Sequence, residues 1–127
     1  MLAVDTNVVV RLLVDDDERQ TAQARRLFEA DDVWIGITVL LEAAWVLASA
    51  YEMKEADVAA SLRRLLGLPN VHVEDAAIVA TALDAVAGGL ELADALHLLR
   101  VPYASEFATF DRALARAGRK LRSVRAL

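Results

Sequence analysis

The sequence predicts an α/β fold in a single domain, with a parallel β-sheet flanked by helices. Short apolar segments that suit buried strands alternate with longer segments of helical periodicity. Hydrophobic residues make up 57% of the chain and are mostly Ala, Val and Leu, as expected for helices packed on a parallel sheet. The 127 residues suit one domain with one core, and we expect that sheet to be covered on both faces.

The first third of the chain predicts two strands and two helices. Residues 2–4 form a buried strand that ends in a polar turn, with Asp5 at its carboxyl end. A helix follows over residues 8–14. Acidic residues 15–18 precede a second helix over residues 18–29, where the helix dipole favours negative charge. Residues 33–37 form the second strand.

The middle of the chain predicts two helices and a third strand. Thr38 is the expected N-cap of a helix that carries Glu42 and runs to about residue 51. A second helix over residues 54–66 is closed by Gly67 and Pro69. The third strand is short and covers residues 71–73.

The last third of the chain predicts three helices and two strands. Glu74 and Asp75 open a helix over residues 76–87, and a helix over residues 92–100 carries Asp94 before Pro102 stops it. A fourth strand lies within residues 104–110. Asp111 is the expected N-cap of a helix over residues 112–117, and the fifth strand covers residues 121–124.

Composition and charge limit the cellular setting. The chain has no cysteine, which excludes disulfides and thiolate metal sites and favours a reducing compartment. No apolar run is long enough to cross a bilayer and no signal peptide precedes the first strand, so we expect a soluble cytoplasmic protein. The net charge of −5 argues against an indiscriminate nucleic-acid coat protein. Residues 112–127 carry six basic side chains and no acid, which indicates either a solvated surface or one that attracts phosphates.

Four acidic residues are difficult to explain by solubility: Asp5, Glu42, Asp94 and Asp111. Glu42 lies within an apolar segment, and no Lys or Arg occurs between Arg26 and Lys54. Because ligands of open α/β sheets bind beyond the carboxyl ends of the strands, we expect the four to converge there. Two carboxylates about 4 Å apart repel by roughly 4 kcal/mol at an effective dielectric near 20. Such a cluster persists by protonation or by binding a cation, and oxygen ligands select Mg²⁺ or Mn²⁺, which favours phosphoryl transfer or phosphodiester hydrolysis.

Each acid also has a simpler explanation. Asp5 and Asp111 can be explained as helix N-caps with no further role, each contributing about 1 kcal/mol. Asp94 can pair with His97, one helical turn further on. Glu42 has the weakest alternative, because a buried unpaired carboxylate is costly.

Several neighbouring side chains are candidates for a supporting role. Thr6, Asn7 and Thr109 flank the acids and can hydrogen-bond a carboxylate, a metal-bound water or a phosphate, although turn chemistry explains Thr6 and Asn7 nearly as well. For Tyr103 and Phe107, contact with a ligand and a purely structural role are about equally expected. We expect three other aromatic residues to lie in the core, namely Trp34, Trp45 and Tyr51.

The ordered set of motifs around the four acids resembles the PIN domain, specifically its VapC-type toxins. The matching segments are 5–7, the apolar helix with Glu42, 93–97 and 109–111, so the resemblance covers residues 1–127. It implies a PIN-like, Rossmann-like domain with a five-stranded parallel sheet and a Mg²⁺- or Mn²⁺-dependent endoribonuclease activity. It also implies that Asp5, Asp94 and Asp111 hold metal, while Glu42 completes the outer coordination or orients water.

The same resemblance implies partners: an RNA substrate, a cognate VapB-like antitoxin and a second copy of the chain in a homodimer. The helices around residues 42–51 and 54–66 are candidates for the antitoxin surface. From the residues alone, three alternatives stay open. They are a metal-dependent DNA nuclease, a phosphatase, and a non-catalytic module whose acidic pocket receives a basic peptide.

Overall fold

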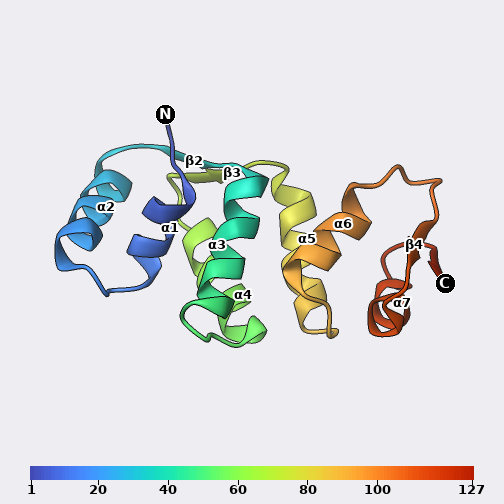
Figure 1. Cartoon of the computed structure of the whole chain (residues 1–127). Coiled ribbons are helices and arrows are strands. Elements are labelled where there is room, and N and C mark those ends of the chain that lie inside the picture. Colours follow the sequence, from blue (N-terminus) through green and yellow to red (C-terminus); the bar gives the residue numbers. More distant parts are fainter. The chain divides into compact units, whose positions relative to one another are not determined.

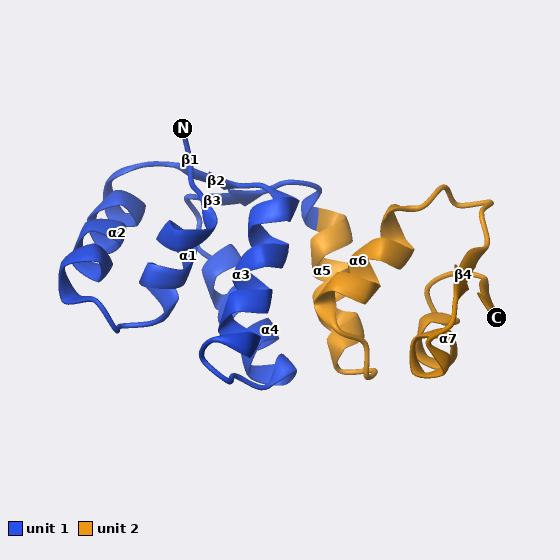
Figure 2. Ribbon diagram, in the orientation of Figure 1, with its two compact units in different colours: residues 1–76 blue, residues 77–127 orange.

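A computed structural model describes residues 1–127 as an α/β chain with seven helices and five strands (Figure 1). The chain divides into two compact units, residues 1–76 and residues 77–127 (Figure 2). Residues 1–76 contain β1 (Leu2–Ala3), α1 (Thr6–Leu13), α2 (Glu18–Ala30), β2 (Val33–Ile35), α3 (Ile37–Ser49), α4 (Glu55–Leu66) and β3 (Val71–Val73). The remaining elements are α5 (Ala76–Val86), α6 (Leu92–Arg100), β4 (Phe107–Thr109), α7 (Arg112–Gly118) and β5 (Val124–Ala126). No helix is both long and apolar enough to cross a membrane.

All strand pairings are parallel, which confirms the predicted fold class. In the first unit the strand order is β1-β2-β3, with Val33 of β2 opposite Leu2 on one side and Val71 on the other. In the second unit β4 pairs with β5 through Phe107 and Val124. The five predicted strands are therefore present, but their hydrogen bonds form a three-stranded and a two-stranded sheet instead of one five-stranded sheet.

The three-stranded sheet has one buried face. Val33 and Ile35 are fully buried, whereas Trp34 between them is 36% exposed. Trp34 lies opposite His72 of β3, which is also exposed. The prediction of a sheet covered on both faces is wrong here, because the side chains of β2 alternate between core and solvent.

The core of the first unit lies between its helices. α1 packs against α2 and α3, and α3 packs against α4. Apolar side chains spaced three or four residues apart line these contacts, as amphipathic helices require. The fully buried ones include Val9, Leu40, Leu47 and Leu62.

The second unit has its own buried side chains on α5, α6 and α7. Leu96 and Leu98 of α6 are almost completely buried, as is Val79 of α5. Gly118, the last residue of α7, permits a close approach to α6, because a Cβ atom there would lie 2.7 Å from Leu98 Cδ1. A larger residue at position 118 would force the two helices apart or displace a buried leucine.

Two predicted helix caps are wrong. α3 starts at Ile37 after Gly36, so Thr38 lies inside the helix and does not cap it. The backbone N–H of Ile37 instead donates to Glu74 Oε1, 3.1 Å away. Glu74 was expected to open α5, but its carboxylate serves a helix that starts far earlier in the sequence.

Elsewhere the predicted boundaries shift by a few residues. α1 begins at Thr6, two residues before the expected start, because Asp5 caps it. β5 covers Val124–Ala126 instead of residues 121–124.

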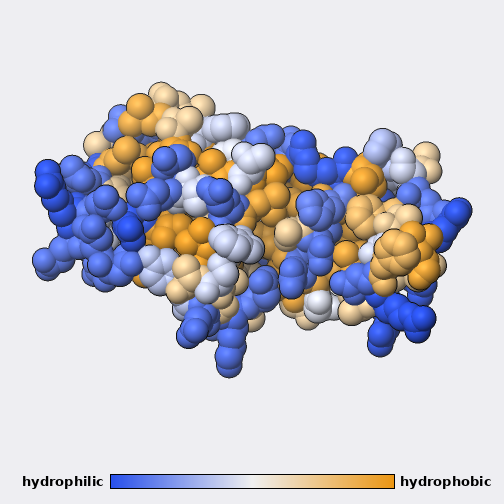
Figure 3. All heavy atoms as spheres, viewed as in Figure 1, coloured by the Kyte–Doolittle hydropathy of each residue, from blue (hydrophilic) through white to orange (hydrophobic).

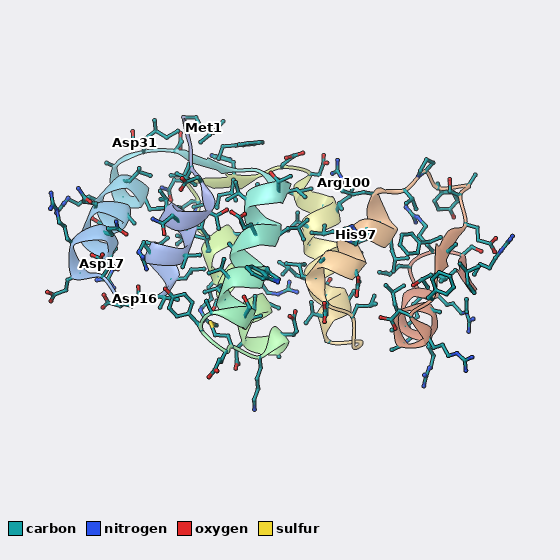
Figure 4. All side chains as sticks on the ribbon, in the orientation of Figure 1. Met1, Asp16, Asp17, Asp31, His97 and Arg100 are labelled. Atoms are coloured by element: carbon teal, nitrogen blue, oxygen red, sulfur yellow. The ribbon has the colours of Figure 1, made fainter.

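A polar network joins α1, the α1–α2 loop and the segment after α3. Arg11 donates to Asp16, at 2.7 Å, and to Gln20 Oε1, at 2.6 Å. The Tyr51 hydroxyl donates to the second carboxylate oxygen of Asp16. Tyr51 therefore belongs to a partly exposed hydrogen-bond network and not to the predicted core. Figure 4 labels Asp16 in this loop.

Candidate functional site

Asp5 lies directly after the first strand and begins α1. Its Oδ1 atom accepts a hydrogen bond from the backbone N–H of Val8, 3.2 Å away, and its extended backbone is that of an N-cap. The capping explanation for Asp5 is thus confirmed. The side chain is exposed and its second oxygen takes no part in the cap, so a further role is open to it. Thr6 and Asn7 form the first turn of α1, whereas the sequence predicted a polar turn before the helix.

Glu42 lies on the exposed side of α3. Leu40, Ala43 and Leu47 form the buried side, whereas Glu42 shares the exposed side with Trp45. Glu42 is therefore not the buried carboxylate in need of a partner that the sequence predicted. Helical periodicity carries the signal that was missed: positions 38, 42, 45 and 49 follow one stripe, and all four are exposed.

Trp45 and Trp34 were predicted to lie in the core, and this prediction is wrong. Trp45 is 68% exposed and Trp34 is 36% exposed. An exposed tryptophan lies one helical turn from Glu42, which gives this stripe of α3 both a carboxylate and a large apolar surface.

Asp94 and Asp111 are electrostatic neighbours in the second unit. Partial burial raises the pKa of Asp94 above its usual value, and the negative charge of Asp111 raises it further, while His97 opposes the shift. Asp94 lies in the first turn of α6 and His97 lies one turn later, where it is labelled in Figure 4. The predicted proximity of His97 to Asp94 is thus supported, and the effect of His97 on this pKa is larger than that of Asp111.

Asp111 is held more firmly than Asp5. Its Oδ1 atom accepts hydrogen bonds from the backbone N–H groups of Ala113 and Leu114, at 2.9 and 3.0 Å, so it is the predicted N-cap of α7. The Thr109 hydroxyl accepts a hydrogen bond from the backbone N–H of Asp111 at 3.0 Å. Thr109 therefore positions the backbone of Asp111, and the second oxygen of Asp111 is not used by the cap.

The four acids divide equally between the two units. Asp5 and Glu42 belong to the first, and Asp94 and Asp111 to the second. Neither unit by itself holds three His, Asp or Glu side chains grouped closely enough to bind a metal ion. The donors nevertheless fit Mg²⁺ or Mn²⁺ in kind, because all are carboxylate oxygens and the Asp94–Asp111 repulsion is of the kind that a cation relieves. Their convergence on one ion stays a prediction.

Arg122 makes a contact that the sequence did not predict. Its guanidinium carbon lies 5.2 Å from the centre of the Tyr103 ring. In the sequence it is one of six basic residues after Asp111, and nothing in that run distinguishes it from the others. The contact joins the loop after α6 to the segment before β5.

The chain belongs to the PIN domain family, whose model matches residues 2–120. Comparisons with curated proteins and with solved structures gave no match. PIN domains are generally metal-dependent nucleases that bind nucleic acids and use divalent ions such as Mg²⁺. The predicted family is thus confirmed, and with it the general class of a metal-dependent nuclease.

Proposed function

We propose that this PIN-domain protein is a Mg²⁺- or Mn²⁺-dependent endoribonuclease and the toxin of a toxin–antitoxin pair. The observation that carries the proposal is the match of residues 2–120 to a nuclease family, in a chain where the charge of Asp111 contributes to a raised pKa of Asp94. Two carboxylates that repel each other in one environment are a usual starting point for a divalent ion site. The order of motifs around the four acids, which resembles the VapC-type toxins, supports the finer assignment.

Asp5, Asp94 and Asp111 are the proposed metal ligands. Asp5 and Asp111 each use one oxygen to cap a helix, which restricts the side chain and leaves the other oxygen for an ion. Thr109 supports this arrangement through the backbone of Asp111. When bound, such an ion lowers the pKa of water and neutralises charge that develops on the scissile phosphate.

Glu42 is the proposed group that orients the attacking water. It is exposed and makes no hydrogen bond or ion pair with protein groups, so its carboxylate is free to accept a proton from water. Water as the nucleophile requires no 2′-hydroxyl, and the products carry a 5′-phosphate and a 3′-hydroxyl. Thr6 and Asn7, in the first turn of α1 beside Asp5, are proposed to contact substrate.

The toxin assignment implies protein partners. We propose a VapB-like antitoxin that covers the exposed side of α3, where Trp45 presents apolar surface beside Glu42. A basic side chain of the antitoxin that reaches the acids would form charge-assisted hydrogen bonds with them. A homodimer of the chain is part of the same proposal.

The nuclease activity is tested by incubating the Mn²⁺-loaded protein with a structured RNA, a duplex DNA and a small phosphomonoester. We expect cleavage of RNA alone, with 5′-phosphate ends, and loss of most activity in Asp94→Asn and Glu42→Gln. Glu29→Gln is the matched control, because Glu29 is an exposed acid on α2, a helix that carries none of the four. Hydrolysis of the monoester alone, or of DNA alone, would replace the ribonuclease assignment with one of the alternatives.

The toxin role is tested in cells by inducing the protein with and without the product of its neighbouring open reading frame. We expect growth arrest that the neighbouring product relieves. Arrest that survives Asp5→Asn combined with Asp94→Asn would show that toxicity does not depend on the acids.

A further inference from the structure

We infer that Tyr103, supported from one side by Arg122, is a stacking platform for an unpaired nucleobase of the substrate. The inference rests on the proposed nuclease function and adds a substrate-binding residue to it. It would make the substrate single-stranded at the bound position, because the faces of paired bases are hidden within a duplex.

The Tyr103 ring is unusually open to solvent. It is 87% exposed, in the loop between α6 and β4. Phe110, at the end of β4, is 83% exposed. Around β4 and α7 the surface shows hydrophobic and hydrophilic side chains next to each other (Figure 3). Aromatic rings interleaved with charged groups are typical of surfaces that bind single-stranded nucleic acids.

Arg122 holds its position through contacts that do not involve an acid. Its Nη1 and Nη2 atoms donate to the backbone carbonyls of Leu121 and Leu99, at 3.1 and 3.3 Å. Leu99 lies in the last turn of α6, where the helix dipole favours a cation. The buried Nε atom makes no hydrogen bond, and no carboxylate pairs with the guanidinium. The positive charge therefore remains available to the ring.

The cation restricts the ring without covering it. A guanidinium 5.2 Å from the ring centre lies within the range of a cation–π interaction and engages one face of Tyr103. The high exposure of Tyr103 shows that most of its surface stays open to solvent. A ring that is already oriented loses less conformational entropy when a base stacks on it.

The charge of the segment after Asp111 favours a phosphate-bearing ligand. The chain after Asp111 contains six basic side chains and no acid, namely Arg112, Arg116, Arg119, Lys120, Arg122 and Arg125. Only Arg125 pairs with an acid among these, at 2.5 Å from Glu106. Such a surface attracts a nucleic-acid backbone in a salt-dependent manner, while the ring supplies a contact that is independent of salt. An acidic protein segment would use the charge but would not require an aromatic face.

The test uses a short RNA with one 2-aminopurine among uridines, whose fluorescence is quenched when the base stacks. Binding is measured in chelator and again in Ca²⁺. We expect quenching with the unsubstituted protein and with Tyr103→Phe. Tyr103→Ala should weaken binding by roughly 5- to 150-fold, the equivalent of about 1 to 3 kcal/mol per stacked base. Tyr103→Leu, which keeps apolar bulk but has no aromatic ring, should lose the quenching as well.

A charge control separates the platform from general attraction. Arg122→Ala and Arg116→Ala each remove one positive charge, but only Arg122 contacts the ring. We expect both to reduce the salt dependence of binding and only Arg122→Ala to reduce the quenching. The RNA annealed into a duplex should show no change with Tyr103→Ala.

Three results would overturn the inference. They are no quenching with the unsubstituted protein, full quenching with Tyr103→Ala, and a Tyr103→Ala variant that binds an acidic peptide more weakly to the same extent as it binds RNA more weakly. Failure of the nuclease proposal is distinct, because it would show as absent RNA cleavage whatever the state of Tyr103. Circular dichroism of each variant checks that binding is lost from a folded protein.

Discussion

Asp111 has two roles that substitution can separate, helix capping and proposed metal binding. Asparagine is as good an N-cap as aspartate but carries no charge, whereas alanine can do neither. Asp111→Ala leaves the N–H groups of Ala113 and Leu114 without their acceptor. We expect it to lower the free energy of unfolding by about 1 to 2 kcal/mol in chelator.

Asp111→Asn should change stability by no more than about 0.5 kcal/mol, because the lost attraction to the helix dipole is offset by relief of the repulsion from Asp94. Both substitutions should abolish most Mn²⁺-dependent cleavage. Urea unfolding measures the first effect: with a slope of about 2 kcal/mol per molar, 1 kcal/mol moves the midpoint by about 0.5 M. The reasoning is refuted if Asp111→Asn destabilises as much as Asp111→Ala, or if it cleaves RNA at the unsubstituted rate.

The remaining predictions concern pH and packing. The pKa of Asp94 is raised in the folded protein, so the stability that protonated Asp94 contributes is lost as pH rises through that pKa. The ionised Asp94 is unfavourable in the folded state at pH 7, so Asp94→Asn should raise the urea midpoint there and have no effect below about pH 3.8. The hydrogen bond from Tyr51 lowers the pKa of Asp16 in the folded protein. The contribution of ionised Asp16 to stability is therefore present above the unfolded-state pKa of 3.8 and is lost as pH falls below it. Asp16→Asn should therefore lower the urea midpoint at pH 7, with a difference that shrinks in acid. Gly118→Ala places a Cβ 2.7 Å from Leu98 Cδ1; overpacking of about 1 to 3 kcal/mol, less about 1 kcal/mol gained in helix propensity, leaves a net loss of about 0 to 2 kcal/mol and should lower the melting temperature by up to several degrees. An unchanged melting temperature would show that Leu98 moves aside freely.

Local chemistry explains which elements the sequence predicted well. α6 was predicted at its observed bounds, because Pro102 follows it closely. The start of α7 was correct, because Asp111 caps it. Short-range signals of this kind need no knowledge of the tertiary structure.

Features that depend on distant contacts were missed. The cap of α3 comes from Glu74, after the third strand, which a search for a nearby Ser, Thr or Asp could not find. Strands of two or three residues carry too little pattern to show how they divide between sheets. The contact of Arg122 with Tyr103 likewise depends on tertiary packing.

The local structure around the candidate residues was predicted in part. The caps at Asp5 and Asp111 and the proximity of His97 to Asp94 agree with what the sequence indicated, while the convergence of the four acids stays a prediction. The exposure of Glu42 follows from helical periodicity, which places it on the exposed stripe of α3 although most residues around it are apolar.

The proposed function depends most on one step: we propose that Asp5 and Asp94 bind the same divalent ion. Calorimetric titration with Mn²⁺ of the unsubstituted protein, Asp5→Asn, Asp94→Asn and the double variant tests it most directly. The claim predicts that each single substitution weakens binding by about tenfold or more, and that the double variant loses much less than the sum of the two free-energy changes. Mn²⁺ affinity that is unchanged by Asp5→Asn, or losses that add fully, would show that the two units do not share an ion.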